Sequence, residues 1–188
     1  MNATESLRKF VDALERAGVP YMLTGSYASS FHSLPRATRD LDFVISPTRE
    51  QVRALVAELP KDEFYVDERA ALEALNGHGQ FNAIDTTTGW KADFIIQKPR
   101  SFSRSEFERR YRATLDGVEL TIATAEDVLL AKLEWAKLGS SDRQIEDAAT
   151  ILKARADRMD RPYLEVWIRQ LGVESQWQAA LRAAGIEM

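Results

Sequence analysis

Acidic side chains within apolar segments are the residues of this sequence best suited to do chemistry. Asp40 and Asp42 are two residues apart at an expected strand, so the period of two directs both carboxylates to one face. Asp93 is a lone carboxylate in another apolar segment, where burying a charge is costly without a partner. Neighbouring carboxylates repel each other and are cheap to keep ionised only around a cation. The three acids could therefore hold one or two metal ions for phosphoryl or nucleotidyl transfer.

The types of ligand indicate which metal such a site would select. Oxygen ligands, in a chain with only the two histidines His32 and His78, favour Mg²⁺ or Mn²⁺ over zinc. The absence of cysteine excludes a disulfide framework, a Cys-ligated zinc site, an Fe–S cluster and a thiol nucleophile. The alternative, that Asp40 and Asp42 simply face solvent on an edge strand, stays open at this point.

Gly25 and Ser26 stand where an expected strand passes into an expected helix. Glycine lets a phosphate approach the backbone, and the helix start adds free N–H groups, its positive dipole end and the Ser26 hydroxyl. The sequence contains neither a P-loop nor a G-x-G-x-x-G motif. The pair therefore predicts phosphate binding of some other type.

The elements that must position these residues follow from hydrophobic periodicity and breakers. The pattern predicts strands at 21–23, 41–46, 80–87, 90–97 and 118–122, and helices at 5–17, 27–34, 48–59, 67–75, 103–112, 161–171 and 174–184. Two further helices are expected from Thr124 to Gly139 and from Ser141, where Ser141 and Gln144 match a capping box. Residues 76–79 read as a turn and 80–97 as a hairpin. We therefore expect an α/β (α+β) fold, with a core at 1–122 and a helical region at 123–188.

Composition narrows the class of protein further. The 188 residues carry 25 Lys and Arg against 29 Asp and Glu, a formal charge of −4, and 45% of the residues are hydrophobic. This is a folded globular composition, and its mild acidity argues against a protein that coats nucleic acid. We find neither a signal peptide pattern nor a run of apolar residues long enough for a membrane span, so we expect a cytoplasmic protein.

Taken in order, these motifs resemble the DNA polymerase β-type nucleotidyltransferase superfamily. The resemblance rests on Gly25-Ser26, a spacer, Asp40-Leu41-Asp42 and the later Asp93. Within that superfamily, residues 25–42 are most similar to the AbiEii-like toxins of type IV toxin–antitoxin systems. Lys132 and Asp147, on successive expected helices, fall at places that match this group. Gly-Ser, where many of these toxins have Gly-Gly, is a departure from their pattern.

The resemblance implies a small mixed sheet flanked by helices and assigns roles to individual residues. Asp40 and Asp42 would bind the metals that bridge the NTP phosphates, and Asp93 would complete the second metal site and help to activate the acceptor hydroxyl. Gly25 and Ser26 would hold the β- and γ-phosphates. Lys132 would offset phosphate charge, and Asp147 would orient that lysine. Without the resemblance, the residues favour the ordinary interpretation, in which Lys132 and Asp147 are helix residues with their charges in water.

A basic stretch with interleaved aromatic residues, 97–112, suggests contact with RNA. It carries a local charge of +4, because six basic residues stand against Glu106 and Glu108. The nucleic-acid candidates are Arg36, Arg39, Arg109, Arg110 and Arg112. Phe107 and Tyr111 are four residues apart, so they could instead anchor a helix to the core.

Three functional hypotheses remain open on the sequence alone. The first is a metal-dependent nucleotidyltransferase that modifies tRNA as a toxin, with an NTP as substrate and a cognate antitoxin as partner. The second keeps the chemistry and changes the acceptor to a protein or a small hydroxylated compound. The third is a catalytically silent binding module with the same fold.

Overall fold

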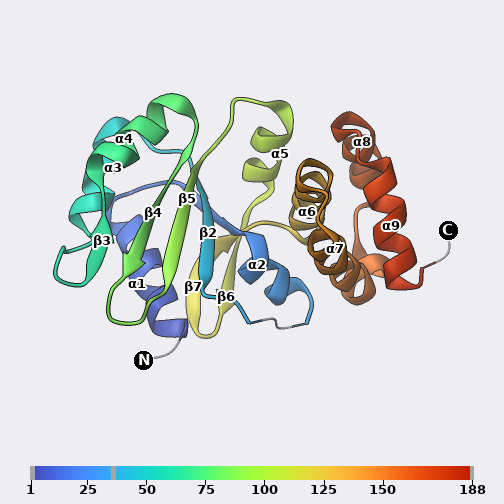
Figure 1. The fold of residues 1–188 in the computed structure, drawn as a ribbon, viewed down its shortest axis with the longest axis horizontal. Helices are drawn as coiled ribbons and strands as arrows, with labels where there is room; N and C mark the ends of the chain where they lie inside the picture. Colours follow the sequence, from blue (N-terminus) through green and yellow to red (C-terminus); the bar gives the residue numbers. More distant parts are fainter. Residues whose placement is uncertain (1–2, 35–36, 187–188) are drawn as a thin grey trace.

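The computed structural model describes residues 3–34 and 37–186, which form one mixed sheet flanked by helices (Figure 1). The strands are β1 (Tyr21–Thr24), β2 (Asp40–Ile45), β3 (Phe64–Val66), β4 (Gln80–Asp85), β5 (Lys91–Ile96), β6 (Tyr111–Leu115) and β7 (Val118–Ile122). The helices are α1 (Ala3–Arg16), α2 (Gly25–His32), α3 (Arg49–Ala57), α4 (Glu68–Gly77), α5 (Ser101–Arg109), α6 (Ala125–Gly139), α7 (Asp142–Arg155), the 3₁₀ turn η1 (Ala156–Arg158), α8 (Arg161–Leu171) and α9 (Glu174–Ala184). No helix within these ranges is long and apolar enough to cross a bilayer.

The sheet places the acidic strands at its centre. Its order is β3-β4-β5-β2-β1-β7-β6, with β2 parallel to β5 and antiparallel to β1. All of the described strands precede residue 123, and the described elements after it are helices. Figure 1 shows α6, α7, α8 and α9 gathered at one end of the molecule, and α2 contacts both α6 and α7.

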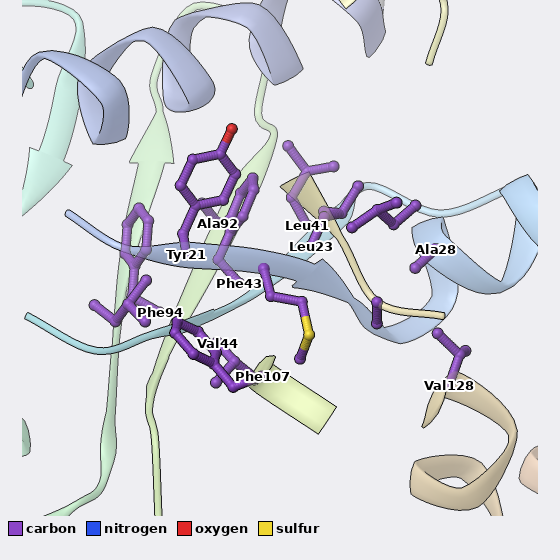
Figure 2. Close-up of a cluster of buried hydrophobic side chains, with 14 of the residues drawn as sticks. Tyr21, Leu23, Ala28, Leu41, Phe43, Val44, Ala92, Phe94, Phe107 and Val128 are labelled. Carbon is purple, nitrogen blue, oxygen red and sulfur yellow. The ribbon is translucent and has the colours of Figure 1, made fainter. Parts of the chain in front are cut away.

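Alternation along β2 separates a core face from a polar face. Leu41 and Phe43 are fully buried, and Phe43 stacks on Phe94 of β5 at 5.9 Å between ring centroids. Phe94 in turn meets Phe10 of α1, so this face is covered by the N-terminal helix (Figure 2 shows part of the cluster). Asp40 and Asp42 alternate with these residues and therefore project from the other face.

The structure confirms the mixed α/β class and differs from the predicted elements at several points. Helix α4 continues to Gly77, and His78 follows as its left-handed cap, so the predicted turn is shorter than 76–79. Helix α5 ends at Arg109, because Tyr111 begins strand β6 and pairs there with Ile122 of β7. Strands β3 and β6 were missed. The Asp116-Gly117 turn between β6 and β7 was the available signal for β6, since such dipeptides typify two-residue hairpins.

The predicted capping box at Ser141 and Gln144 is wrong. Ser141 is the N-cap of α7, but its side chain makes no capping hydrogen bond. A capping box occurs instead at α3, where Thr48 and Gln51 exchange both hydrogen bonds. The motif predicted the start of α7 correctly and the use of the Gln144 side chain incorrectly.

Candidate active site

Asp42 and Asp93 are direct neighbours on the two central strands. They are paired residues of the parallel strands β2 and β5, and Asp40 precedes Asp42 by two residues on the same face. Burial, and then the negative charge of Asp93, raises the pKa of Asp42 above its ordinary value. Lys132 and a backbone hydrogen bond from Ser26 act in the opposite direction. The sheet therefore concentrates negative charge that favours a cation.

The start of α2 is fitted against the Asp42 carboxylate. Thr24 of β1 pairs with Asp42 across the sheet, and Gly25 follows it as the first residue of α2 with a φ of +66°. A Cβ atom at Gly25 would lie 1.9 Å from Oδ2 of Asp42. Only glycine fits this position, because the left-handed φ and the close approach both exclude a side chain. This packing brings the backbone of α2 to the acidic cluster.

Lys132 connects the same place to the helical region. Its Nζ donates to Oδ2 of Asp147 at 2.8 Å and to Oγ of Ser26 at 3.3 Å. The side chains of Lys132 and Asp147 are only 6% and 10% exposed, so the interpretation of both as solvated helix residues is wrong. A buried lysine aimed at a helix start can neutralise an anion that binds there.

Lys91 is a charged neighbour of these acids and was not among the predicted site residues. Its Nζ lies 2.8 Å from Oδ2 of Asp93 and 3.4 Å from Oδ1 of Asp40. Hydrogen bonding to Asp93 accordingly raises the pKa of Lys91. The signal was present in the sequence, because Lys91 and Asp93 are two apart on one strand and must share a face.

The oxygen ligands of Asp40, Asp42 and Asp93 are of the type that a hard divalent cation prefers, but the three carboxylates are not arranged around a single position. Among the residues that the structure describes, no three or more His, Asp or Glu side chains stand close enough to hold a metal ion as they are. The Lys91 ammonium bridges Asp40 and Asp93 instead. The carboxylates offer only oxygen ligands, which Mg²⁺ and Mn²⁺ prefer. Their mutual repulsion calls for a cation, and the amine of Lys91 now serves as that counter-ion. The metal assignment stays a prediction.

These residues open into one cavity of about 580 Å³ between the polar face of the sheet and helices α5, α6 and α7. Its lining includes Gly25, Ser26, Asp40, Asp42, Asp93 and Lys132. Six of the sequence-predicted site residues therefore share one wall, and Asp147 supports it through Lys132. A volume of this size is typical of a small-molecule or cofactor site.

Of the predicted nucleic-acid residues, those that the structure describes are not in the lining of this cavity. Arg109 contacts Glu126 and Asp127 and lies over the Tyr163 ring, Arg110 lies over the Phe107 ring, and Arg112 pairs with Glu15 at 2.5 Å. Arg39 is exposed beside Asp40. Arg36 lies outside the described residues.

Two acids near the cavity were not predicted as site residues. Burial, and then Asp127, raises the pKa of Glu106 to about 8, and Glu106 lines the cavity. Glu134 lines it too and forms a bidentate pair with Arg100, at 2.5 and 2.6 Å. In the sequence, both acids look like ordinary charged residues of a helix, so nothing there marked them as site residues.

No protein-family model matches the sequence, and the search of curated proteins finds no relative. Solved structures do resemble the fold. The solution structure of the antibiotic-resistance factor ANT(2'')-Ia matches with a TM-score of 0.55 and 15% identity, over 95% of this chain and 96% of that one. A nucleotidyltransferase-like protein from Paracoccidioides brasiliensis matches with a TM-score of 0.52 and 16% identity, over 98% and 94%.

A crystal structure of ANT(2")-Ia in complex with adenylyl-2"-tobramycin also matches, with a TM-score of 0.51 and 13% identity over 96% of each chain. At these identities the likeness concerns the fold. The likeness extends over nearly the whole of each chain, because the matches cover 94% to 98% of them. The chain has the fold of these nucleotidyltransferase structures.

Proposed function

We propose that this chain transfers a nucleotide from an NTP to a hydroxyl acceptor with the help of Mg²⁺ or Mn²⁺. The observation that carries the proposal is the convergence of three elements on one cavity: the paired acids Asp42 and Asp93, the glycine-led start of α2, and the buried Lys132. The fold of the structural neighbours supports the same reaction class. The resemblance to AbiEii-like toxins is a finer proposal that rests on the sequence motifs.

The proposed roles follow from these positions. Asp40, Asp42 and Asp93 would hold the metal, which when bound supplies charge compensation for the phosphates. Gly25 offers a close backbone approach, Ser26 a hydroxyl and Lys132 an ammonium to the β- and γ-phosphates. Asp147 is a positioning residue, because it holds the Lys132 amine at 2.8 Å.

The reaction itself exchanges one P–O bond for another. The acceptor oxygen bonds to the α-phosphorus, the bond from that phosphorus to the α,β-bridging oxygen breaks, and pyrophosphate leaves. The proton of the acceptor hydroxyl must pass to a base. We assign this role to Asp93, whose side chain lies in the cavity wall and is 14% exposed.

The acceptor is the part of the proposal that needs experiment most. A tRNA acceptor, a toxin role and an antitoxin partner rest on the resemblance. Arg109 and Arg112 are less available to bind RNA than the sequence suggested, because their guanidinium groups contact carboxylates of this chain. Lys98 and Arg143, which line the cavity, are better placed to meet a polyanion.

Incubation with each labelled NTP, Mg²⁺ or Mn²⁺ and pools of tRNA, protein or aminoglycoside tests the reaction. We expect label transfer that Asp42→Asn abolishes and Asp62→Asn, an exposed acid away from the cavity, leaves intact. Transfer that survives Asp42→Asn would remove the assigned site. Absence of transfer to every pool, together with no NTP binding by calorimetry, would favour the silent binding module.

A further inference from the structure

The α6–α7 hairpin carries a second row of side chains beside the proposed phosphate site. The two helices are joined through Ser140 and Ser141 and run antiparallel. The bond from Lys132 to Asp147 fixes their register. One helical turn nearer the connection, at i+3 on α6 and i−3 on α7, stand Trp135 and Gln144. Both line the same cavity as Lys132.

Gln144 presents a hydrogen-bond acceptor that lacks a partner. Among the buried side-chain nitrogen and oxygen atoms of the described residues, Oε1 of Gln144 is the one without a hydrogen-bond partner. The capping role that would have used this amide is not filled, since Ser141 makes no side-chain cap. A buried acceptor left unsatisfied costs about 1–3 kcal/mol. Because Gln144 lines the cavity, a rotation of its amide would let a bound molecule supply the missing donor.

Trp135 presents a large aromatic surface in the same place. It is 59% exposed, and its neighbour along the helix, Leu138, is 72% exposed, although both line the cavity. An exposed tryptophan and leucine in a concave wall mark a binding surface rather than a packed core. Stacking on tryptophan suits any planar ring, and a base stacked on an aromatic side chain gains about 1–3 kcal/mol.

The spacing of these features matches the parts of a nucleotide. At 1.5 Å per residue, the row from Lys132 through Trp135 to Leu138 spans about 9 Å along α6. Cationic groups for phosphate lie at one end, and an aromatic face with an amide acceptor lies beyond them. A nucleobase supplies what the second part lacks, because it combines a flat ring with an edge that carries N–H donors.

We infer that Trp135 and Gln144 form the nucleobase subsite of the NTP whose phosphates are held at Gly25, Ser26 and Lys132. The base stacks on Trp135 and donates an edge N–H to Oε1 of Gln144. This inference rests on the proposed nucleotidyl transfer and names the part of the substrate that each residue reads. A ring of the acceptor in this place is the competing outcome.

Calorimetric titration of the full chain with each NTP–Mg²⁺ identifies the tightest-binding nucleotide, written ATP below. Its comparison with inorganic tripolyphosphate–Mg²⁺ tests the subsite without an acceptor. We expect Trp135→Ala and Gln144→Leu each to weaken ATP binding about tenfold. Tripolyphosphate affinity should stay within about twofold of wild type. Gln178→Ala, at an exposed glutamine of α9, is the matched control and should leave both affinities unchanged. Both test variants should fold, because one replaces an exposed ring and the other removes an unsatisfied buried acceptor.

The outcomes separate this inference from the function on which it rests. If both variants bind ATP as the wild type does, the base subsite is wrong and nucleotide binding stands. Equal losses for ATP and tripolyphosphate would also overturn it, because the residues would then act on phosphate. A wild-type protein that binds neither tripolyphosphate nor any of the four NTPs would overturn the proposed function and this inference together. If it binds ATP but not tripolyphosphate, the ATP affinities of the variants decide.

Discussion

Replacement of Gly25 by alanine tests how tightly the start of α2 is fitted to the acidic cluster. The added Cβ would lie 1.9 Å from Oδ2 and 2.6 Å from Cγ of Asp42, so the carboxylate must move by roughly 1 Å or more. Displacement of packed groups costs about 1–3 kcal/mol. The left-handed φ of +66° adds about 1–2 kcal/mol for any L side chain. We therefore expect Gly25→Ala to lower the free energy of unfolding by about 2–5 kcal/mol.

Gly117 offers a matched control for the backbone part of this effect. Its φ is +74°, but a Cβ there meets nothing within 4 Å. Gly117→Ala should therefore cost only about 1–2 kcal/mol in urea unfolding. The remaining difference should shrink when Gly25→Ala is combined with Asp42→Ala, which removes Cγ and Oδ2 and leaves only the Asp42 Cβ, 2.8 Å away.

The double-mutant cycle gives a result that would refute this reasoning. We expect a coupling energy of at least about 1 kcal/mol between positions 25 and 42, since the two side chains compete for one space. Equal costs for Gly25→Ala and Gly117→Ala, with no coupling to Asp42, would mean that α2 is not fitted to the carboxylate.

Three further predictions concern charged groups of the site. Lys91→Met should enlarge the rise in Tm on addition of Mg²⁺, because the lysine amine then no longer competes for Asp40 and Asp93; an unchanged rise contradicts this. Lys132→Met should lower the free energy of unfolding in urea by about 3–5 kcal/mol, because it leaves Asp147 buried without its partner. Arg69→Met, at the exposed i,i+4 pair with Glu73, should lower it by about 0.5 kcal/mol or less. Similar costs would show that the pair of Lys132 and Asp147 is not effectively buried. The pKa of Glu106 rises from 4.5 to about 8, mainly through burial, so the folded state holds this proton more tightly and stability falls as pH rises from about 4.5 to 8. Thermal unfolding from pH 5 to 9 should show that Glu106→Gln removes this part of the slope, and parallel curves would contradict it.

The acidic wall could be predicted because strand geometry is local. Asp40 and Asp42 share a face in any strand, and burial of Leu41 and Phe43 decides which face that is. The same rule would have identified Lys91 from its spacing to Asp93. The pairing of Asp42 with Asp93 was not accessible in this way, because it depends on which strands become neighbours.

The helical region shows where motif reasoning reaches its limit. Thr124 caps α6 as predicted, with its side chain accepting from the N–H of Asp127. The equally plausible box at Ser141 and Gln144 does not form. A capping motif marks where a helix begins, but the packing of α7 against α6 and the cavity beside them decide where the side chains go.

The sequence by itself determined the chemistry on offer: carboxylates two apart, a Gly-Ser turn before a helix, and no cysteine. These depend on residue type and on the periods of strand and helix, which act over a few residues. Only the tertiary structure decided that Lys132 reaches Ser26, 106 residues away, and that Arg109 and Arg112 pair within the chain. Such contacts depend on sheet order and helix register, because those bring distant segments together.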